Sequence, residues 1–433
     1  MPWNFHHYYT SQTDGLIGKL LLTVQEKNEL KALRQKVRLR TKDVFEEAKK
    51  IARDVKYTQF TEDRIKEELA NSKLKYLSEE EQRKISRLIF NMDDDSREEF
   101  LNLTPRFWTQ GSFQYDTLNR PFQPGQEVDI DDGTYMPMTI FESEPKIGHT
   151  LLLLLVDSSL KSLEADNDGW VFEAKQTCGR IKIPYKKIHI DVPMYAIPKD
   201  QFFQKELAKA VSLNRNMACE SYDFANEMAK GREAYKVDSK CVNLALRDGD
   251  KKWNNSDPKI VEDWFNDSCK RVGRHLRQVC RFMKAWRDAQ WEVGGPSSIS
   301  LMAATVNILD KKPHDKEDLG KTMKIVAEHL PGEFMNGVMS PDDTDDKPLF
   351  PPYHEHGARE NAIIERLEKL YSILLDAEAA ESKSEALCIM NTAFGNRVTE
   401  ISLIISEQAA PAFKAAPNST SNPTKISSTM VSG

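Results

Sequence analysis

The sequence predicts an α+β protein: a sheet-containing lobe with a long N-terminal spine helix, followed by a helical C-terminal lobe. Three observations support this. A chain of 433 residues is too long for one ordinary hydrophobic core. Helical and strand-like segments are mixed up to about residue 200. From about Ser256 onward the apolar spacing is helical. We therefore expect a sheet-containing lobe over 1–250, a helical lobe over 251–408 and a disordered tail over 409–433.

The spine helix is expected to begin near Thr23. Thr23 and Glu26 have the spacing of a capping box, in which each side chain bonds the other residue's backbone N–H. Apolar residues then recur in steps of three, four and seven, at Leu30, Leu33, Val37, Val44, Ala48, Ile51 and Val55. About 30 residues would span roughly 45 Å, enough to run along the back of both lobes. We interpret this helix as a packing element whose Lys and Arg residues are solvated.

The sheet is expected to form between residues 106 and 196. A helical stretch over 79–103 is ended by Thr104-Pro105. The expected strands are then 106–110, 128–138, 170–176, 179–185 and 187–196, with a turn at 123–126 and a helix over 147–163. In the last strand, Ile188, Ile190 and Val192 face one way, and Lys187, His189 and Asp191 face the other.

The second lobe should begin with a helix capped by Asp257-Pro258. Its buried stripe comprises Val261, Trp264, Phe265, Val272, Leu276, Val279, Met283 and Trp286, and 294–296 ends the element. Another helix carries Ile299, Met302, Val306 and Leu309 inward. An acidic loop at 342–346 and two final helices, over 359–379 and 382–407, complete the lobe. The tail from about 409 is rich in Pro, Ser, Thr, Asn and Ala, a composition typical of disorder.

Gly111-Ser112 and Asp129-Ile130-Asp131 carry the strongest chemical signal. A glycine after a strand lets the backbone approach a phosphate closely, and Ser112 adds a hydroxyl. Asp129 and Asp131 are two apart on a strand, so both carboxylates point to one face. Asp191, on the polar face of another strand, would complete a two-metal Mg²⁺ site.

Each of these motifs is common by itself, and Asp131-Asp132-Gly133 could form a simple acidic turn. The ordered combination of Gly-Ser, D-x-D and a third aspartate favours the functional interpretation. Such a site would activate a ribose 3′-hydroxyl for attack on the α-phosphorus of a nucleoside triphosphate. We interpret His189 as a packing or hydrogen-bonding residue rather than as a base.

Composition limits the partners. The net charge of −6 argues against a long nucleic acid as the main ligand or as an activator. No stretch of about 18 apolar residues is present, and MPWNFHHYYT lacks the order of a secretion signal. We therefore expect no membrane partner and a cytoplasmic protein. His354 and His356 follow a proline pair, and we interpret them as part of a solvated turn.

Specific runs of sequence resemble the bacterial cGAS/DncV-like nucleotidyltransferases, in particular those that make cyclic GMP–AMP. These runs are WTQGSFQYD at 108–116, DIDDGTY at 129–135, HIDVPMY at 189–195 and GGPSSIS at 294–300. The resemblance covers nearly the whole chain. It implies a polymerase β-like nucleotidyltransferase lobe, a helical lobe that closes the nucleotide pocket, and two Mg²⁺ ions. One departure from the wider polymerase β-like pattern is the long gap between Ser112 and Asp129.

The resemblance also implies nucleotide contacts. Residues expected to line the donor triphosphate are Gln110, Gly111, Ser112, Phe113, Gln114 and Tyr115. Arg180 would contact a base or phosphate, Lys284 would reach the triphosphate from the helical lobe, and Ser298 and Asp345 would close the pocket. Lys284 lies on a basic stripe with Arg274, Arg277 and Arg281, and we interpret those arginines as solvated.

The activity implied by the resemblance is synthesis of cyclic GMP–AMP, expected to be 3′,3′-linked, from ATP and GTP with release of pyrophosphate. The product would be a second messenger of anti-phage defence (CBASS) that activates a downstream effector. Gly433 would be a conjugation point for a ubiquitin-activating-like enzyme. Two alternatives stay open: an RNA-tailing or small-molecule-modifying transferase of the same superfamily, and a catalytically silent, conjugated scaffold.

Overall fold

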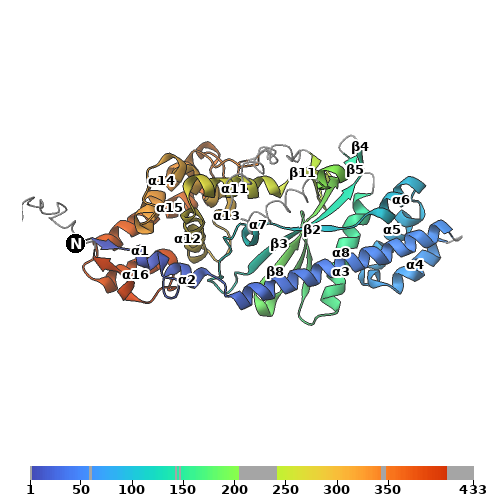
Figure 1. Ribbon diagram of the computed structural model, residues 1–433, viewed down its shortest axis with the longest axis horizontal. Helices are drawn as coiled ribbons and strands as arrows, with labels where there is room; N and C mark the ends of the chain where they lie inside the picture. The colour runs from blue at the N-terminus through green and yellow to red at the C-terminus, as the bar shows by residue number, and fades with distance from the viewer. Residues whose placement is uncertain are drawn as a thin grey trace, which may run out of the picture.

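The computed structural model describes residues 2–57, 61–141, 144–145, 148–203, 241–342 and 348–406. Two groups of elements lie side by side along the long axis of the molecule (Figure 1). A mixed sheet and the long helix α3 occupy one end, and the helices of the C-terminal half occupy the other. Among the described residues, no helix combines the length and apolar composition needed to span a bilayer.

The first lobe contains an eight-stranded sheet. Its strands are β2 (Arg106–Thr109), β3 (Val128–Met138), β6 (Val171–Ala174), β7 (Gly179–Ile183), β8 (Ile188–Val192), β9 (Met194–Pro198), β10 (Asn243–Ala245) and β11 (Trp253–Asn255). The neighbours run in the order β11-β10-β9-β3-β8-β7-β6, and β2 also pairs with β3. The long strand β3 therefore contacts β2, β8 and β9, which makes it the centre of the lobe.

The expected strand over 187–196 is divided in two at Pro193. Proline has no N–H to donate to a ladder, so it ends β8. The register along β3 continues across the break, because Val128 pairs with Ile188 and Thr134 pairs with Met194 at the same offset. Thr134 N also donates to Pro193 O at 2.8 Å. The segment thus keeps its course beside β3 even though one hydrogen bond is missing.

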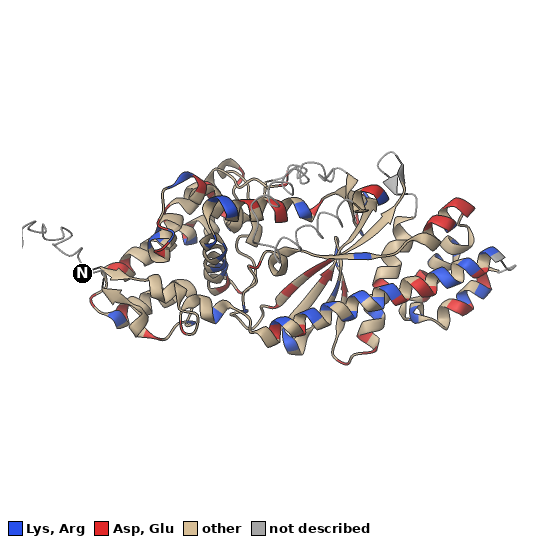
Figure 2. Cartoon of the chain, in the orientation of Figure 1, with Lys and Arg blue, Asp and Glu red and all other residues tan. Residues whose placement is uncertain are grey.

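Helices α3 (Val24–Tyr57) and α8 (His149–Ala165) pack against each other in this lobe. The expected capping box is confirmed, since Thr23 N donates to Glu26 Oε2 at 2.7 Å and Glu26 N donates to Thr23 Oγ1 at 3.2 Å. The buried residues of α3 belong to the core of the sheet lobe, so the helix does not extend along both lobes. Its Lys and Arg residues alternate with acidic ones along the surface (Figure 2).

The expected helix over 79–103 is also divided. It forms α5 (Glu79–Phe90) and α6 (Asp94–Asn102), because Asp93 starts a new helix by accepting a hydrogen bond from Ser96 N. The remaining short elements of the first lobe are α4 (Glu62–Ala70), η1 (Lys73–Tyr76), α7 (Gly111–Gln114), β4 (Ile140–Phe141), β5 (Glu144–Pro145) and η2 (Pro184–Lys186).

The second lobe is helical, as expected. Its helices are α11 (Pro258–Val272), α12 (His275–Gln290), α13 (Ser298–Lys311), α14 (Leu319–Met335), α15 (Ala358–Ala379) and α16 (Lys383–Phe394), with the short η4 (Tyr353–Glu355) and η5 (Ile401–Leu403). The single helix expected from Pro258 is divided by Gly273, whose φ is +133°. The last helix ends at Phe394 rather than 407, because Gly395 has a φ of +71°.

The N-terminal residues pack with the second lobe. Strand β1 (Trp3–Asn4) pairs with β12 (Ile405–Ser406), and α1 (His6–Thr10) and α2 (Leu16–Leu20) lie beside α16 (Figure 1). Phe5, Tyr8, Tyr9, Leu16, Ile17 and Leu20 belong to the core of the helical lobe. The start of the chain, which the expected division at residue 250 assigns to the sheet lobe, therefore packs with the helices of the other lobe.

Candidate active site

Carboxylates from two adjacent parallel strands meet at the centre of the sheet. The register of β3 and β8 places Asp131 opposite Asp191 and Asp129 opposite His189. The residues between them, Ile130 and Ile190, are fully buried on the other face. The alternation expected from the sequence is thus confirmed. Because Asp131, Asp132 and Gly133 lie inside β3, the acidic-turn alternative is wrong.

The electrostatics of this cluster fit a divalent cation. Burial, together with the charges of Asp129 and Asp191, raises the pKa of Asp131 to about 7. Asp129 Oδ1 is shielded from solvent, and the imidazole of His189 lies 3.1 Å from it. Like charges held this close are costly unless a cation joins them. Carboxylate oxygens are the ligands that Mg²⁺ prefers.

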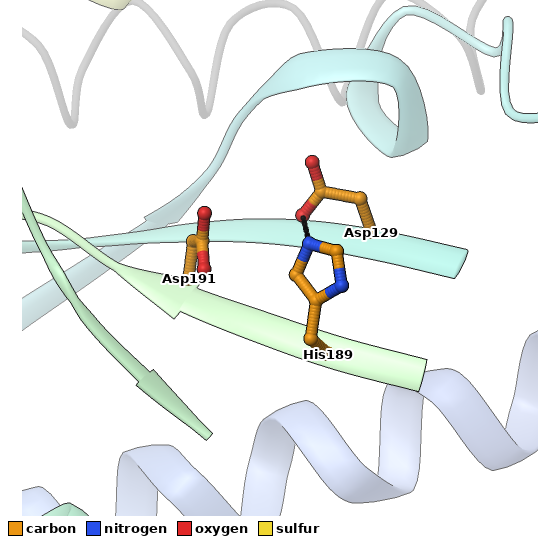
Figure 3. A group of neighbouring side chains, drawn as sticks. All are labelled: Asp129, His189 and Asp191. Atoms are coloured by element: carbon orange, nitrogen blue, oxygen red, sulfur yellow. Dashed lines mark ion pairs between the residues drawn. The ribbon is translucent and has the colours of Figure 1, made fainter. Parts of the chain in front are cut away.

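His189 lies between the acidic side chains of Asp129 and Glu127, and Figure 3 shows its contact with Asp129. Its Nε2 is 3.1 Å from Asp129 Oδ1, and its Nδ1 is 2.9 Å from Glu127 Oε2. Burial opposes the charged form of this imidazole, but the hydrogen bond and charge of Asp129 outweigh it and raise the pKa of His189. Asp129, His189 and Asp191 each offer a ligand atom, and these atoms lie within 4.8 Å of one another. His189 therefore contacts the acidic cluster directly, and its ring also stands where it could offer a metal ligand.

Arg180 is held by the third carboxylate. It lies on β7 opposite Asp191, and its Nε and Nη2 donate to the two oxygens of Asp191 at 2.6 and 2.8 Å. This bidentate pair raises the pKa of Arg180 above its usual value. The structure therefore places Arg180 at the carboxylate cluster.

Gly111 brings the backbone into contact with the same cluster. It begins α7 with a φ of +62°, and a Cβ atom there would lie 1.9 Å from Asp131 Oδ2. Gln110 N donates to Asp131 O at 2.8 Å, which fixes the turn to β3. Glycine is required here both for the left-handed backbone and for the close approach. The expected pairing of Gly-Ser with the acids is thus present in space.

The other residues expected to line the triphosphate have different surroundings. The Gln110 side chain is buried, donates to Tyr135 Oη at 3.0 Å and accepts from Tyr195 Oη at 3.3 Å. Tyr115 is buried beside Phe265 of the helical lobe. Through their side chains, Gln110 and Tyr115 support the turn.

Phe113 packs on the sheet-lobe core, with the Arg34 guanidinium 5.6 Å from its ring centre. Gln114 donates to Glu262 Oε1 at 3.0 Å. Ser112, partly exposed, remains next to Gly111 and accepts from Thr117 N through its carbonyl at 2.9 Å. The side chains of the other four expected residues are thus occupied by contacts within the protein. Gly111 and Ser112 are therefore the best suited of the six to bind a phosphate.

Lys284 and Ser298 lie in the helical lobe. Lys284 is buried on α12, its Nζ donates to Thr117 O at 2.8 Å, and burial lowers its pKa to about 8. Ser298 Oγ accepts from Arg287 Nη1 at 2.7 Å. The expected contacts of Asp345 and Gly433 lie outside the described residues.

The structure shows functional neighbours that sequence reasoning missed. Arg281, interpreted above as solvated, is 3% exposed, and its contacts connect α12 with the loop after α7. Asp132 is paired with Arg38 of α3. In the sequence, Asp132 is marked only by its position next to Asp131, and Arg281 only by its position near Lys284. The pattern of charges does not reveal which arginine is buried.

Comparison with known proteins agrees with this geometry. Residues 105–195 match the model of the cyclic GMP-AMP synthase DncV-like nucleotidyltransferase domain, and residues 273–407 match that of the cyclic GMP-AMP synthase C-terminal domain. The chain is 67% identical to a cyclic GMP-AMP synthase of Vibrio cholerae serotype O1 and 61% identical to one of Escherichia coli, over the full length of each pair.

Solved structures of Vibrio cholerae DncV have the same fold. One, in complex with the linear intermediate 5′ pppA(3′,5′)pG, has a TM-score of 0.86 at 64% identity, covering 94% of this chain and all of that one. Another is a mutant in complex with ATP, GTP and 5MTHFGLU2, with a TM-score of 0.87 at 65% identity and the same coverage. The chain belongs to the DncV-like cyclic GMP–AMP synthase family of nucleotidyltransferases.

Proposed function

We propose that this enzyme makes cyclic GMP–AMP, with both linkages 3′,3′, from ATP and GTP. The observation that carries the proposal is the position of Gly111 directly over Asp131, in register with Asp191 on the adjacent strand. A backbone turn for phosphate and a carboxylate cluster for cations are thereby combined in one site. Three relatives at 60% identity or more, aligned over their whole length, are named cyclic GMP-AMP synthases.

We assign Asp129, Asp131 and Asp191 to binding two Mg²⁺ ions. Bound there, the two ions would activate the 3′-hydroxyl and stabilise the leaving pyrophosphate. His189, itself held by Glu127, contacts Asp129, and Arg180 holds both oxygens of Asp191. Such outer partners fix the orientation of ligating carboxylates.

We assign the remaining residues to the nucleotides. Gly111 and Ser112 receive the donor triphosphate at the start of α7. Lys284 supplies a positive charge from the helical lobe, and Arg180 contacts a base or phosphate from β7. Gln110, Tyr115 and Phe113 shape the turn, while Ser298 and Asp345 complete the pocket. The site would be used twice, first for a linear dinucleotide and then for ring closure.

We assign the product to second-messenger signalling in anti-phage defence (CBASS), with a cyclic-dinucleotide-activated effector as its receiver. Gly433 is the proposed point of conjugation by a ubiquitin-activating-like enzyme. The substrates are mononucleotides, and we propose neither a nucleic-acid activator nor a membrane partner.

The direct test is a product assay. Purified enzyme is incubated with all four ribonucleoside triphosphates and Mg²⁺, then with phosphatase, and the products are identified by mass spectrometry. A phosphatase-resistant mass of one GMP plus one AMP, digested by a nuclease specific for 3′–5′ linkages, is the expected result. Pyrophosphate release with only linear products would favour a tailing or small-molecule transferase. No turnover in either the free or the conjugated protein would favour the silent scaffold.

A further inference from the structure

Three basic residues of α12 converge on one loop of the sheet lobe. They are Arg277, Arg281 and Lys284, which are spaced four and three residues apart and therefore share one face of the helix. The basic residues of α12 are coloured blue in Figure 2. Their acceptors are the backbone carbonyls of residues 115–118. Arg277 Nε donates to Tyr115 O at 3.2 Å, Lys284 Nζ to Thr117 O at 2.8 Å, and Arg281 Nη1 to Leu118 O.

The loop depends on these donors. The carbonyls of Tyr115, Thr117 and Leu118 lie beyond the four-residue helix α7, so no further helical turn follows to bond them. In return, Asn119 Nδ2 donates to Arg281 O at 2.8 Å. Backbone carbonyls that are removed from water must find partners. The helical lobe supplies those partners through charged side chains, which form the stronger class of hydrogen bond.

Asp116 gives the loop a strained point. Its φ is +54°, a left-handed conformation that is uncommon for a residue other than glycine. Its side chain pairs with Arg281 Nη2 at 2.9 Å. The Arg281 side chain is 4% exposed, whereas that of Asp116 is 68% exposed. Such conformations persist when the surrounding structure determines them, and the ion pair with Arg281 is a contact by which the helical lobe reaches Asp116.

A second helix of the same lobe holds α7 from its other side. Glu262 of α11 accepts from Gln114 Nε2 at 3.0 Å and from Trp108 Nε1 at 3.3 Å. The short segment from β2 to residue 119 is therefore attached to the helical lobe at both ends of α7. Gly111 and Ser112 lie between these attachments.

We infer that the helical lobe positions the triphosphate turn over the metal-binding carboxylates, and that Arg281 is the central positioning residue of this clamp. The inference rests on the proposed function of that turn. Without Arg281, the turn should sample positions in which Gly111 no longer abuts Asp131. The apparent affinity for triphosphate then falls in proportion to the competent fraction, while saturating nucleotide selects the competent state. The clamp therefore predicts a change in KM rather than in kcat.

The test compares Arg281→Gln, Asp116→Gly and the double variant with the wild-type enzyme. Arg281→Gln removes the charged donor, and Asp116→Gly removes an exposed carboxylate at a positive φ that glycine adopts readily, so we expect this variant to fold. We expect KM for ATP and GTP to rise about ten-fold in Arg281→Gln, with kcat within about two-fold. In a double-mutant cycle, residues that act as one unit are non-additive, so the double variant should resemble Arg281→Gln alone.

The matched control is Arg271→Gln, which breaks another bidentate pair of the helical lobe, with Asp310, away from the loop. It should leave both constants unchanged. An unchanged KM in Arg281→Gln, or multiplicative effects in the double variant, would overturn the inference. So would a loss of kcat that merely follows the unfolded fraction measured by circular dichroism.

The failure of the clamp can be separated from failure of the proposed function. Calorimetric titration with Mg²⁺–ATP gives a dissociation constant that requires no turnover. If the wild-type protein makes no cyclic product, the proposed function fails, yet a dissociation constant raised about ten-fold in Arg281→Gln would still support the clamp. Equal dissociation constants in the two proteins would reject it.

Discussion

Gly111 and Asp131 are so close that a methyl group on Gly111 would lie 1.9 Å from the Asp131 carboxylate. Gly111→Ala should therefore displace either the turn or the metal-binding side chain, and a misplacement of about 1 Å can cost 100-fold in rate. We expect cyclic dinucleotide synthesis to fall by about 100-fold or more, measured by product formation. Gly249→Ala is the control, because Gly249 also has a positive φ but nothing lies within 4 Å of its added Cβ. Similar losses in both variants would mean that backbone strain alone, not the contact with Asp131, controls activity.

The acidic cluster predicts dependence on a divalent cation. Treatment with EDTA should abolish synthesis, and added Mg²⁺ should restore it. Asp191→Asn keeps the shape but removes one of the three carboxylate charges offered to a cation, while Arg180 loses its carboxylate partner. Loss of an outer partner of a metal ligand already costs about 10–100-fold, so we expect at least a 100-fold loss of kcat. Asp166→Asn, at an exposed surface pair with Arg40, should have full activity. Activity of Asp191→Asn near the wild-type level would remove Asp191 from the site.

Asp132 connects the candidate site to helix α3. It lies on β3 between the residues that pair with β8 and those that pair with β9. Asp132 is 1% exposed and accepts from Arg38 Nε at 2.7 Å and from Thr109 Oγ1 at 3.0 Å. Removing one partner of a buried ion pair costs about 3–5 kcal/mol. We expect Asp132→Asn to lower the free energy of unfolding by about 3 kcal/mol, near the lower end because Arg38 is 18% exposed.

Urea denaturation followed by circular dichroism measures this change. Asp166→Asn again serves as the control, since its pair with Arg40 on the same helix α3 is largely solvated on the aspartate side. Exposed pairs contribute about 0–1 kcal/mol. Equal free energies of unfolding in the two variants would show that burial of the Arg38–Asp132 pair does not stabilise the protein.

Features with a strong local signal could be predicted from the sequence. The capping box at Thr23, the alternation on β3 and the polar face of Asp191 depend on neighbouring residues alone. They located α3 and the three carboxylates correctly. That Asp191 should lie on a strand next to β3 was expected from chemistry, because a shared metal site would need its carboxylate close to those of Asp129 and Asp131.

Features that depend on tertiary contacts could not be predicted. Arg281 has the spacing of a solvated arginine, and its burial arises from carbonyls 163 positions earlier in the chain. The breaks at Gly273 and Gly395 required backbone angles that the apolar pattern of a helix conceals. The packing of Tyr8 and Tyr9 with the helical lobe brings together residues from opposite ends of the chain.

The start of α12 predicts a pH dependence of stability. Burial, with the nearby His314 and Lys316, lowers the pKa of His275 to about 4, below the value of about 6.5 expected in the unfolded chain. Between these two values the unfolded chain binds more protons, so the free energy of unfolding rises with pH. Stability is therefore fully present above pH 6.5 and is lost as the pH falls toward 4. His275→Phe should lessen this loss of stability, because an aromatic ring still fills the site but can no longer bind a proton. Urea midpoints at pH 7 and pH 5 measure the effect, with the exposed His354→Gln as a reference. If the midpoint falls as far in His275→Phe as in the wild type, the acid sensitivity must come from other groups, such as the buried carboxylates.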